Sequence, residues 1–201
     1  MPRFEVARIR DDAMKFDVGP QLPTLKGQRV AMRWLKDADV PALFKIFSDS
    51  EVMRYWSRPA MRRRDDAEKL IGEIRSLFRS RTLFQWGVAR LEDDAVIGTC
   101  TLARLDATHG IAEVGFALAR DSWRRGYMKE ALPLLVDFAF SRLGLRRLEA
   151  DVDPRNVASL RLLERLGFRR EGLLRERYCM NAELQDAVLL ALLGRDWRGQ
   201  I

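Results

Sequence analysis

The stretch IAEVGFALARDSWRRGYMKEAL, residues 111–132, joins a strand-like segment to the start of a helix through a polar turn. Its first eight residues favour a strand, and a helix is expected from about Gly126. The first turn of a helix carries unpaired backbone N–H groups and a partial positive charge, which suit a phosphate group. Gly126 allows close approach of the backbone, and Arg124 and Arg125 add positive charge. This stretch therefore predicts an anion-binding site at the mouth of a helix.

Strand and helix patterns alternate along the rest of the chain. The expected strands are residues 29–35, 83–90, 95–105, 111–118, 146–153, 167–179 and 184–194, and the expected helices are residues 36–49, 65–81, 126–143 and 156–166. Polar turns between successive strands give antiparallel pairs, whereas a helical crossover gives a parallel pair, expected between residues 111–118 and 147–152. We therefore predict an α/β (α+β) fold, in which about four helices flank a mixed, mostly antiparallel sheet of six to seven strands.

The chain contains one predicted domain. Residues 1–27 end in VGPQLPTLKG, whose glycine and proline residues break regular structure, so we predict an N-terminal extension or loosely attached arm there. Residues 28–201 are expected to form a single domain, because a chain of 201 residues can bury about 70% of its unfolded surface around one core. The composition, 47% hydrophobic and 32% charged, is typical of a globular protein.

The sequence favours a soluble, cytoplasmic protein. The amino terminus lacks the continuous apolar core of a signal peptide, and no apolar run approaches the length that spans a membrane. Cys100 and Cys179 have neither the spacing of a metal site nor the density of a disulfide framework, so a reducing compartment fits best. Neither a metal ion nor a membrane partner is expected.

The charge balance favours an anionic partner without identifying it. The chain has 36 basic and 29 acidic residues, which gives a net charge of +7, and arginine greatly outnumbers lysine. Such a balance suits phosphate or nucleic acid. The basic residues are interleaved with acidic ones, so an arginine-rich coding bias explains the charge equally well, and nucleic acid is not the favoured partner.

Several motifs in the same order resemble one family. WRRGYMKEAL, residues 123–132, matches the W-x-x-G-Y-A-x-E-A-L loop of the RimJ/RimL-like branch of the GNAT acyltransferase superfamily. DPRNVASLRLLERLGF, residues 153–168, is similar to the family signature N-x-x-S followed by a helix and LGF. EVMRYWS, residues 51–57, and RVAMRWLKDADV, residues 29–40, resemble the amino-terminal part of that branch. The resemblance spans roughly residues 24–193.

This resemblance implies an acetyl-CoA-dependent N-acetyltransferase. The two parallel strands would start paired and then splay apart, so that the pantetheine arm adds like an extra strand and the diphosphate lies on the helix start. Met128 stands where the family has Ala or Gly, so its side chain either crowds the diphosphate or points away from it. The implied cofactor contacts are Phe116, Ala117, Leu118, Arg124, Arg125, Gly126, Tyr127, Met128, Lys129, Asn156 and Ser159.

The chemistry needs a base, because an amine must lose a proton before it attacks a thioester. Glu113 resembles the glutamate of the branch's A-E-(I/V)-G motif and is the expected base, with a structural carboxylate as the alternative and Glu149 as the second candidate. Many family members have a tyrosine at the position of Leu163, so the sequence offers no phenol to protonate the leaving thiolate. Ser159 is then the expected donor, although it could equally stabilise its own helix, which Asn156 is expected to cap.

The acceptor pocket is expected to include Tyr55, Trp56 and Trp86, although packing in the core is the alternative for such aromatic residues. His109 falls in a turn and is expected to be a solvated loop residue. The acceptor itself is a primary amine, attacked directly in a ternary complex: a protein N-terminal α-amino group of the ribosomal-protein type, a polyamine or an aminoglycoside. The alternative is a non-catalytic acyl-CoA sensor or a nucleic-acid-binding module on the same fold. Related enzymes often dimerise, so a homodimer is one expected arrangement.

Overall fold

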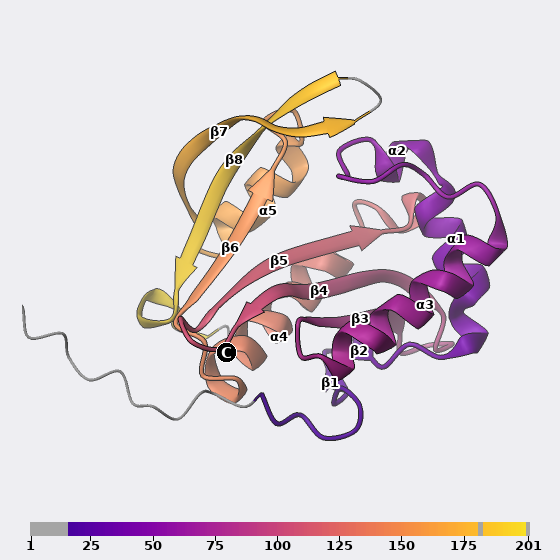
Figure 1. The fold of residues 1–201 in the computed structure, drawn as a ribbon. Coiled ribbons are helices and arrows are strands. Elements are labelled where there is room, and N and C mark those ends of the chain that lie inside the picture. Colours follow the sequence, from indigo (N-terminus) through magenta and orange to yellow (C-terminus); the bar gives the residue numbers. More distant parts are fainter. Residues whose placement is uncertain (1–15, 181–182, 200–201) are drawn as a thin grey trace, which may run out of the picture.

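One mixed sheet runs through the computed structural model, which describes residues 16–180 and 183–199 (Figure 1). Its strands are β1 (Leu25–Lys26), β2 (Val30–Arg33), β3 (Leu83–Arg90), β4 (Val96–Asp106), β5 (Ile111–Leu118), β6 (Arg147–Val152), β7 (Arg169–Met180) and β8 (Glu183–Leu193). They lie in the order β1-β2-β3-β4-β5-β6-β8-β7. The seven predicted strands are present, and β1 is the eighth. A segment of two residues is too short to show the alternation of a strand, so the sequence did not indicate β1.

Helices cover both faces of this sheet. They are α1 (Val40–Ser48), α2 (Ser50–Met53), α3 (Arg64–Arg79), α4 (Tyr127–Asp137) and α5 (Val157–Arg165), with short 3-10 turns η1 (Asp37–Asp39), η2 (Arg120–Ser122) and η4 (Gly194–Asp196) and a π-helical turn η3 (Phe138–Arg142). The four predicted helices are confirmed. Figure 1 shows α4 and α5 on one face and α1 and α3 on the other, while the four-residue α2 leads into the loop that reaches toward the ends of β7 and β8.

The parallel pair is β5 with β6, as predicted, and it is short. Pairing runs from Ile111 with Arg147 to Glu113 with Glu149. Beyond Glu113, β5 continues alongside β4 while β6 continues alongside β8, so the two strands diverge (Figure 1). The mixed α/β prediction is therefore confirmed, and the sheet opens at its centre.

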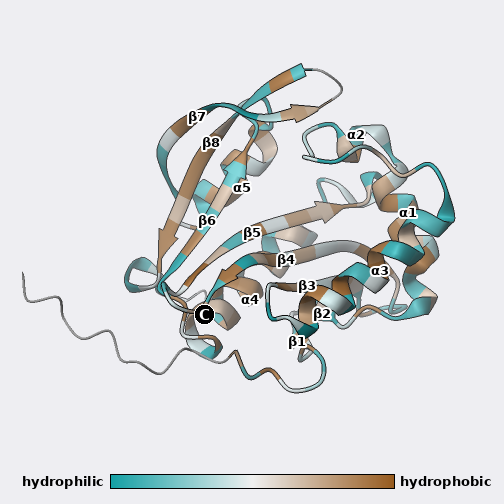
Figure 2. Ribbon diagram, in the orientation of Figure 1, coloured by the Kyte–Doolittle hydropathy of each residue, from teal (hydrophilic) through white to brown (hydrophobic). Residues whose placement is uncertain are grey.

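The interior of the protein has two hydrophobic cores. Figure 2 shows the hydropathy of each residue along the strands and helices that form them. The larger core lies between the sheet and helices α4 and α5, and it includes Trp86, Leu132 and Leu163. The smaller lies between the sheet and helices α1 to α3, and it includes Leu43 and Ile74. Because successive side chains of a strand point to opposite faces, the central strands β3, β4 and β5 contribute to both cores.

Residues 16–26 belong to the folded body and are not a loosely attached arm. Phe16 and Leu22 are buried in the larger core. The indole Nε1 of Trp86 donates a hydrogen bond to the carbonyl of Pro23 at 2.9 Å. These contacts satisfy a buried polar group and bury apolar area, so they hold the segment against the sheet. The rest of the predicted extension, residues 1–15, lies outside the described residues.

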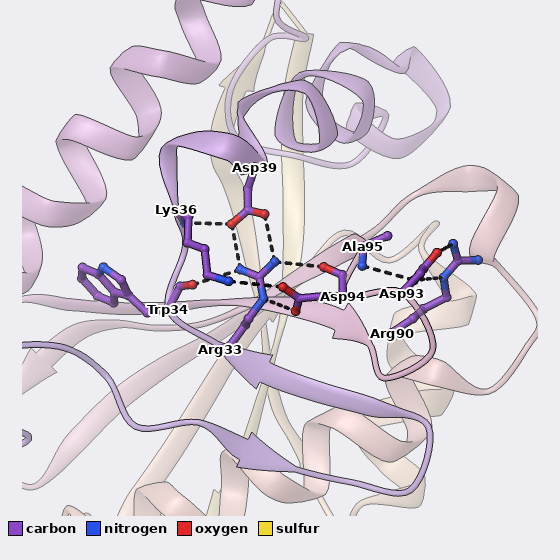
Figure 3. Close-up of polar contacts among 8 residues, drawn as sticks. All are labelled: Arg33, Trp34, Lys36, Asp39, Arg90, Asp93, Asp94 and Ala95. Atoms are coloured by element: carbon purple, nitrogen blue, oxygen red, sulfur yellow. Dashed lines mark hydrogen bonds and ion pairs between the residues drawn. The ribbon is translucent and has the colours of Figure 1, made fainter.

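A buried ion pair connects the end of β2 to two turns (Figure 3). The guanidinium of Arg33 donates to both carboxylate oxygens of Asp39, at 2.8 and 2.9 Å, and its Nε donates to Asp94 at 2.6 Å. Hydrogen bonding to Arg33 holds the pKa of Asp94 below its usual value. Arg33 and Asp39 are both buried, so the pair fixes η1 and the β3–β4 turn against the same strand.

Replacing Arg33 by Met tests this connection. The Asp39 carboxylate would remain buried without its bidentate partner, and breaking a buried pair in this way typically costs about 3–5 kcal/mol. We expect the urea midpoint of unfolding to fall accordingly, with an unchanged denaturant slope. Arg90→Met is the matched control, because it removes the exposed Arg90–Asp93 pair of the same turn and should cost much less. If the two variants lost equal stability, the result would contradict the view that burial makes the Arg33–Asp39 pair the more important one for stability.

Candidate active site

The divergence of β5 from β6 leaves backbone groups of β5 facing the gap. Ala119 N–H donates to the carbonyl of Ile97 at 2.7 Å, so the main chain at Ala119 faces β4. Alternation then directs the N–H and C=O groups of Phe116 and Leu118 away from β4. The Leu118 carbonyl accepts a hydrogen bond from the indole of Trp123 at 2.7 Å. The other backbone N–H and C=O groups of Phe116 and Leu118 form a strand edge to which an extended ligand can bind.

The turn that follows β5 ends at the start of α4. Gly126 is the N-cap of α4, with a φ of 81°, and no side chain caps the helix there. Arg124 also has a positive φ, of 60°. The unpaired N–H groups of the first turn of α4 therefore face the loop that ends at Gly126. A helix start of this kind has the geometry that binds phosphate groups.

Arg29 ties this loop to the sheet. Its Nη1 donates to the carbonyl of Arg125 at 3.0 Å, and its Nε donates to Glu130 at 3.1 Å. Glu130 in turn accepts hydrogen bonds from the N–H groups of Arg29 and Val30. A Cβ added at Gly126 would lie 3.3 Å from Arg29 Nη2. The loop conformation thus depends on both Gly126 and the Arg29–Glu130 pair.

Met128 does not crowd this helix start. Its side chain is buried, with its sulfur 3.5 Å from the sulfur of Cys100 on β4. The side chain therefore packs in the larger core, away from the N–H groups of the first turn. Arg124, Arg125 and Lys129 are exposed around the same turn and surround it with positive charge.

A pocket of about 140 Å³ lies where β5 and β6 separate, and six of the predicted site residues line it. The α2–α3 loop, β5 and α5 all contribute to its wall. The predicted residues that line it are Tyr55, Trp56, Glu113, Phe116, Asn156 and Ser159.

Glu113 occupies the centre of this arrangement. Burial raises the pKa of its carboxyl, and the negative charges of Asp151 and Glu149 raise it further, while Arg104 opposes the shift. Arg104 Nη1 lies 2.9 Å from Glu113 Oε2. A carboxyl group with a raised pKa that still reaches a pocket is suited to take a proton from an amine.

The second candidate, Glu149, faces the same side of the sheet as Glu113 but forms an ion pair with Arg147. Ala150 is buried in the larger core, so alternation turns Glu149 to the opposite face, beside Glu113 in the parallel register. Arg147 Nε donates to Glu149 Oε1 at 2.6 Å. Glu149 does not line the pocket. It contributes negative charge next to Glu113.

Two pocket residues were missed by the sequence analysis, Asp151 and Tyr178. The Tyr178 hydroxyl donates to Asp151 Oδ2 at 3.1 Å, and Arg177 Nε donates to the same oxygen at 3.0 Å. Burial raises the pKa of the Tyr178 phenol, so it stays protonated at neutral pH. The expectation that no phenol is available was wrong, because Tyr178 reaches the pocket from β7, next to Leu163.

Of these two residues, only Asp151 could have been placed near Glu113 from the sequence. Asp151 is two residues after Glu149 on one strand, so alternation alone could have put it on the same face. Tyr178 follows an irregularity in the pairing of β7 between Leu174 and Tyr178, where Glu176 has a φ of 52°. Such a bulge redirects the side chains that follow it and depends on the partner strand.

Trp86 lies elsewhere, which corrects the prediction that it lines the acceptor pocket. It is fully buried in the larger core, with its ring 5.3 Å from that of Phe138. Its neighbour Gln85 faces the other side of the sheet, toward α3. Because side chains alternate along β3, Trp86 and Gln85 point to opposite faces of the sheet. Trp86 points into the larger core, and Gln85 points to the other face.

The remaining predicted residues occupy defined positions. Asn156 caps α5 as expected, since its side chain accepts a hydrogen bond from the N–H of Ser159 at 3.2 Å. The guanidinium carbons of Arg54 and Arg155 lie 5.4 and 5.9 Å from the centre of the Tyr55 ring. His109 is exposed in its turn and bonds Asp106 at 2.7 Å.

Two features are absent from residues 16–180 and 183–199. No three His, Cys, Asp or Glu side chains gather closely enough to hold a metal ion. Among the helices of the same residues, none combines the length and the apolar character needed to cross a membrane.

Comparisons with known proteins agree with this geometry. Residues 29–169 match the model of the acetyltransferase (GNAT) domain. The uncharacterized N-acetyltransferase p20 of Bacillus licheniformis is 34% identical over 178 residues, 89% of this chain and 100% of the relative. The [ribosomal protein uS5]-alanine N-acetyltransferase of Escherichia coli (strain K12) is 23% identical, over 86% of this chain and 92% of the relative. Mycobacterium smegmatis RimJ, solved in complex with CoA-disulfide, has the same fold, with a TM-score of 0.81 at 21% identity over 89% of this chain and 90% of that one.

The charge around Glu113 generates a prediction about its titration. Replacing Arg104 by Met removes the positive charge that lowers the pKa of Glu113, so we expect that pKa to rise further and the ionised fraction at mildly acidic pH to fall. A carboxyl carbon-13 NMR titration of Glu113 measures the change. Arg170→Met is the control, since Arg170 pairs with Glu164 outside the pocket. A Glu113 midpoint that stays the same or falls in Arg104→Met would contradict the assigned cause.

Proposed function

This chain belongs to the GNAT acetyltransferase family, and we propose that it acetylates the N-terminal α-amino group of a polypeptide, of the kind that ribosomal proteins present, in preference to a small amine. As a family member it is an N-acetyltransferase that uses acetyl-CoA. One observation carries the proposal: the edge of β5, the half-buried carboxylate of Glu113 and the first residues of α5 line one pocket, and the turn after β5 leads to the uncapped start of α4. The relatives are named as enzymes, which favours catalysis over an acyl-CoA sensor or a nucleic-acid-binding module.

We assign acetyl-CoA binding to the gap between β5 and β6. The pantetheine arm would pair with the main chain of Phe116 and Leu118, on either side of Ala117, because this edge of β5 has no partner strand beyond Glu113. The diphosphate would bind the N–H groups of residues 124–129. Asn156 and Ser159 on α5 would contact the arm from the other wall of the pocket.

The reaction would proceed by direct attack in a ternary complex. The amine nitrogen forms a bond to the thioester carbonyl carbon, the carbon–sulfur bond breaks, and CoA leaves as its thiolate. Glu113 takes the proton that the amine loses, directly or through water. Ser159 or Tyr178, which line the same pocket, supplies a proton to the thiolate. A thiol with a pKa near that of cysteine, about 8.5, leaves with modest help.

A groove beside the pocket supports a polypeptide acceptor. A space of about 400 Å³ lies between the α2–α3 loop and the ends of β7 and β8, and Trp56 lines both this groove and the pocket. Arg54 and Arg58 line it on one side and Glu183 and Gln185 on the other. An extended chain that follows the reacting amine would find hydrogen-bonding groups on both sides, which a compact amine would leave unused.

Gly126→Ala tests the diphosphate site. A Cβ at a φ of 81°, within 3.3 Å of Arg29 Nη2, is strained, so the loop should shift. A cost of about 1–2 kcal/mol in the loop corresponds to a roughly tenfold loss of acetyl-CoA affinity, measured by calorimetry. Gly19→Ala is the matched control, since Gly19 also has a positive φ, of 75°, and nothing lies within 4 Å of its added Cβ. Equal affinity losses in both variants would contradict a role for this loop.

Glu113→Gln tests the base and the function together. In a thiol-release assay with N-terminal peptides at neutral pH, we expect kcat/KM to fall about 10²- to 10⁴-fold. The wild-type rate should fall as pH drops through the raised pKa of Glu113, because the base works only when ionised. The variant should lose this limb and keep only the titration of the amine.

Glu149→Gln is the control for the same assay, because Glu149 is a neighbouring carboxylate that does not line the pocket. We expect a change of a few fold at most. Full activity in Glu113→Gln would remove Glu113 as the base. Absence of thiol release with every peptide and amine, although acetyl-CoA raises the melting temperature, would overturn the proposed function in favour of a sensor.

A further inference from the structure

We infer that the acceptor carries an apolar side chain next to its reacting amine, and that this side chain fills a second chamber beside Glu113. The inference rests on the proposed function and names the acceptor class of the same site. The chamber has a volume of about 210 Å³ and lies between the sheet and the helices α1 to α3. Most of its wall is apolar, including Phe47, Met53, Ile74, Leu77 and Leu83.

The chamber and the reaction pocket share part of their walls. Trp56, Ser57, Glu113 and Gly115 line both spaces. Gly115 has no side chain between them, and a Cβ there would meet only the Cβ of Thr101, at 3.8 Å. An amine that reaches Glu113 therefore has the chamber directly beside it, on the α1 and α3 face of the sheet.

The floor of the chamber is polar but uncharged. Gln85 pairs in register with Thr101, and Thr101 with Gly115, so the three residues form one row across β3, β4 and β5. Gln85 and Thr101 are both buried and line the chamber. Their amide and hydroxyl groups can bond the carbonyl of an acceptor residue without demanding a charge on its side chain.

The charges of the chamber disfavour a second cation on the acceptor. Glu113 would be engaged with the reacting amine. Glu73, the other carboxylate in the wall, is 59% exposed and lies 3.8 Å from Arg58. The second ammonium group of a polyamine or of a lysine side chain would face apolar walls, where an unpaired charge is unfavourable.

The size of the chamber also limits the acceptor. Sites for whole small-molecule ligands usually measure roughly 300–1,000 Å³. A chamber of about 210 Å³ is smaller than that, and it suits one side chain better than a multi-ring amine such as an aminoglycoside. The rest of a polypeptide would then follow the groove beside Trp56.

A peptide series tests the inference. Peptides that differ only in their first residue (Gly, Ala, Val, Leu, Met or Lys), together with spermidine, would be compared by kcat/KM in the thiol-release assay. We expect kcat/KM to rise about fourfold for each methylene group buried, with leucine or methionine highest. Lysine-first peptides and spermidine should be at least tenfold poorer than leucine-first peptides.

Leu77→Glu provides the complementary test in the protein. Leu77 is 41% exposed, so folding should tolerate the change, and the new carboxylate would line the chamber. We expect kcat/KM to fall at least tenfold for the leucine-first peptide and to rise for the lysine-first peptide. Leu91→Glu is the control, because Leu91 is 48% exposed and follows β3 outside the chamber.

The outcomes separate this inference from the function on which it rests. A flat series, a preference for lysine or spermidine, or equal effects of Leu77→Glu and Leu91→Glu would overturn the apolar chamber while leaving acetyl transfer intact. Loss of thiol release with every acceptor would instead reject the function itself. Acetyl-CoA should raise the melting temperature of Leu77→Glu as much as that of the unaltered protein, since Leu77 does not line the reaction pocket in the β5–β6 gap.

Discussion

The early end of the pairing between β5 and β6 is the constraint on which the site depends. The two strands share a parallel register only as far as Glu113 and Glu149. If the pairing continued, the edge of β5 would be covered by β6 and no gap would remain for an extended ligand. Each strand finds another partner beyond that point, β4 for β5 and β8 for β6, so the sheet opens without leaving either strand unsupported.

The opening also explains the distribution of charge. Glu113, Glu149 and Asp151 lie on one face of two adjacent strands, and arginines from β4, β6 and β7 pair with them. Glu149 and Asp151 are bonded by Arg147 and Arg177, whereas Glu113 combines an ion pair with burial that raises its pKa. Neighbouring carboxylates in one cluster thus have different environments, and the raised pKa of Glu113 suits it to proton exchange in the pocket.

The two faces of the sheet differ in how completely side chains fill them. The face under α4 and α5 is filled by large side chains such as Trp86 and Leu132, and it holds α4, which begins after the loop at Gly126. The face under α1 to α3 is less completely filled near Glu113, where the chamber and the reaction pocket meet. Close packing on one side of the sheet therefore supports an open site on the other side, and loops border that opening.

The sequence by itself determined the features that depend on neighbours along the chain. The strand–turn–helix unit around Gly126, the cap at Asn156 and the mixed order of strands all follow from local periodicity and turn chemistry. Tertiary structure alone decided that Tyr178 reaches the pocket, that Trp86 does not, and that residues 16–26 pack against the sheet. These depend on pairing between distant strands, on a bulge in β7 and on which face of a strand each core needs, and a local pattern carries none of that information.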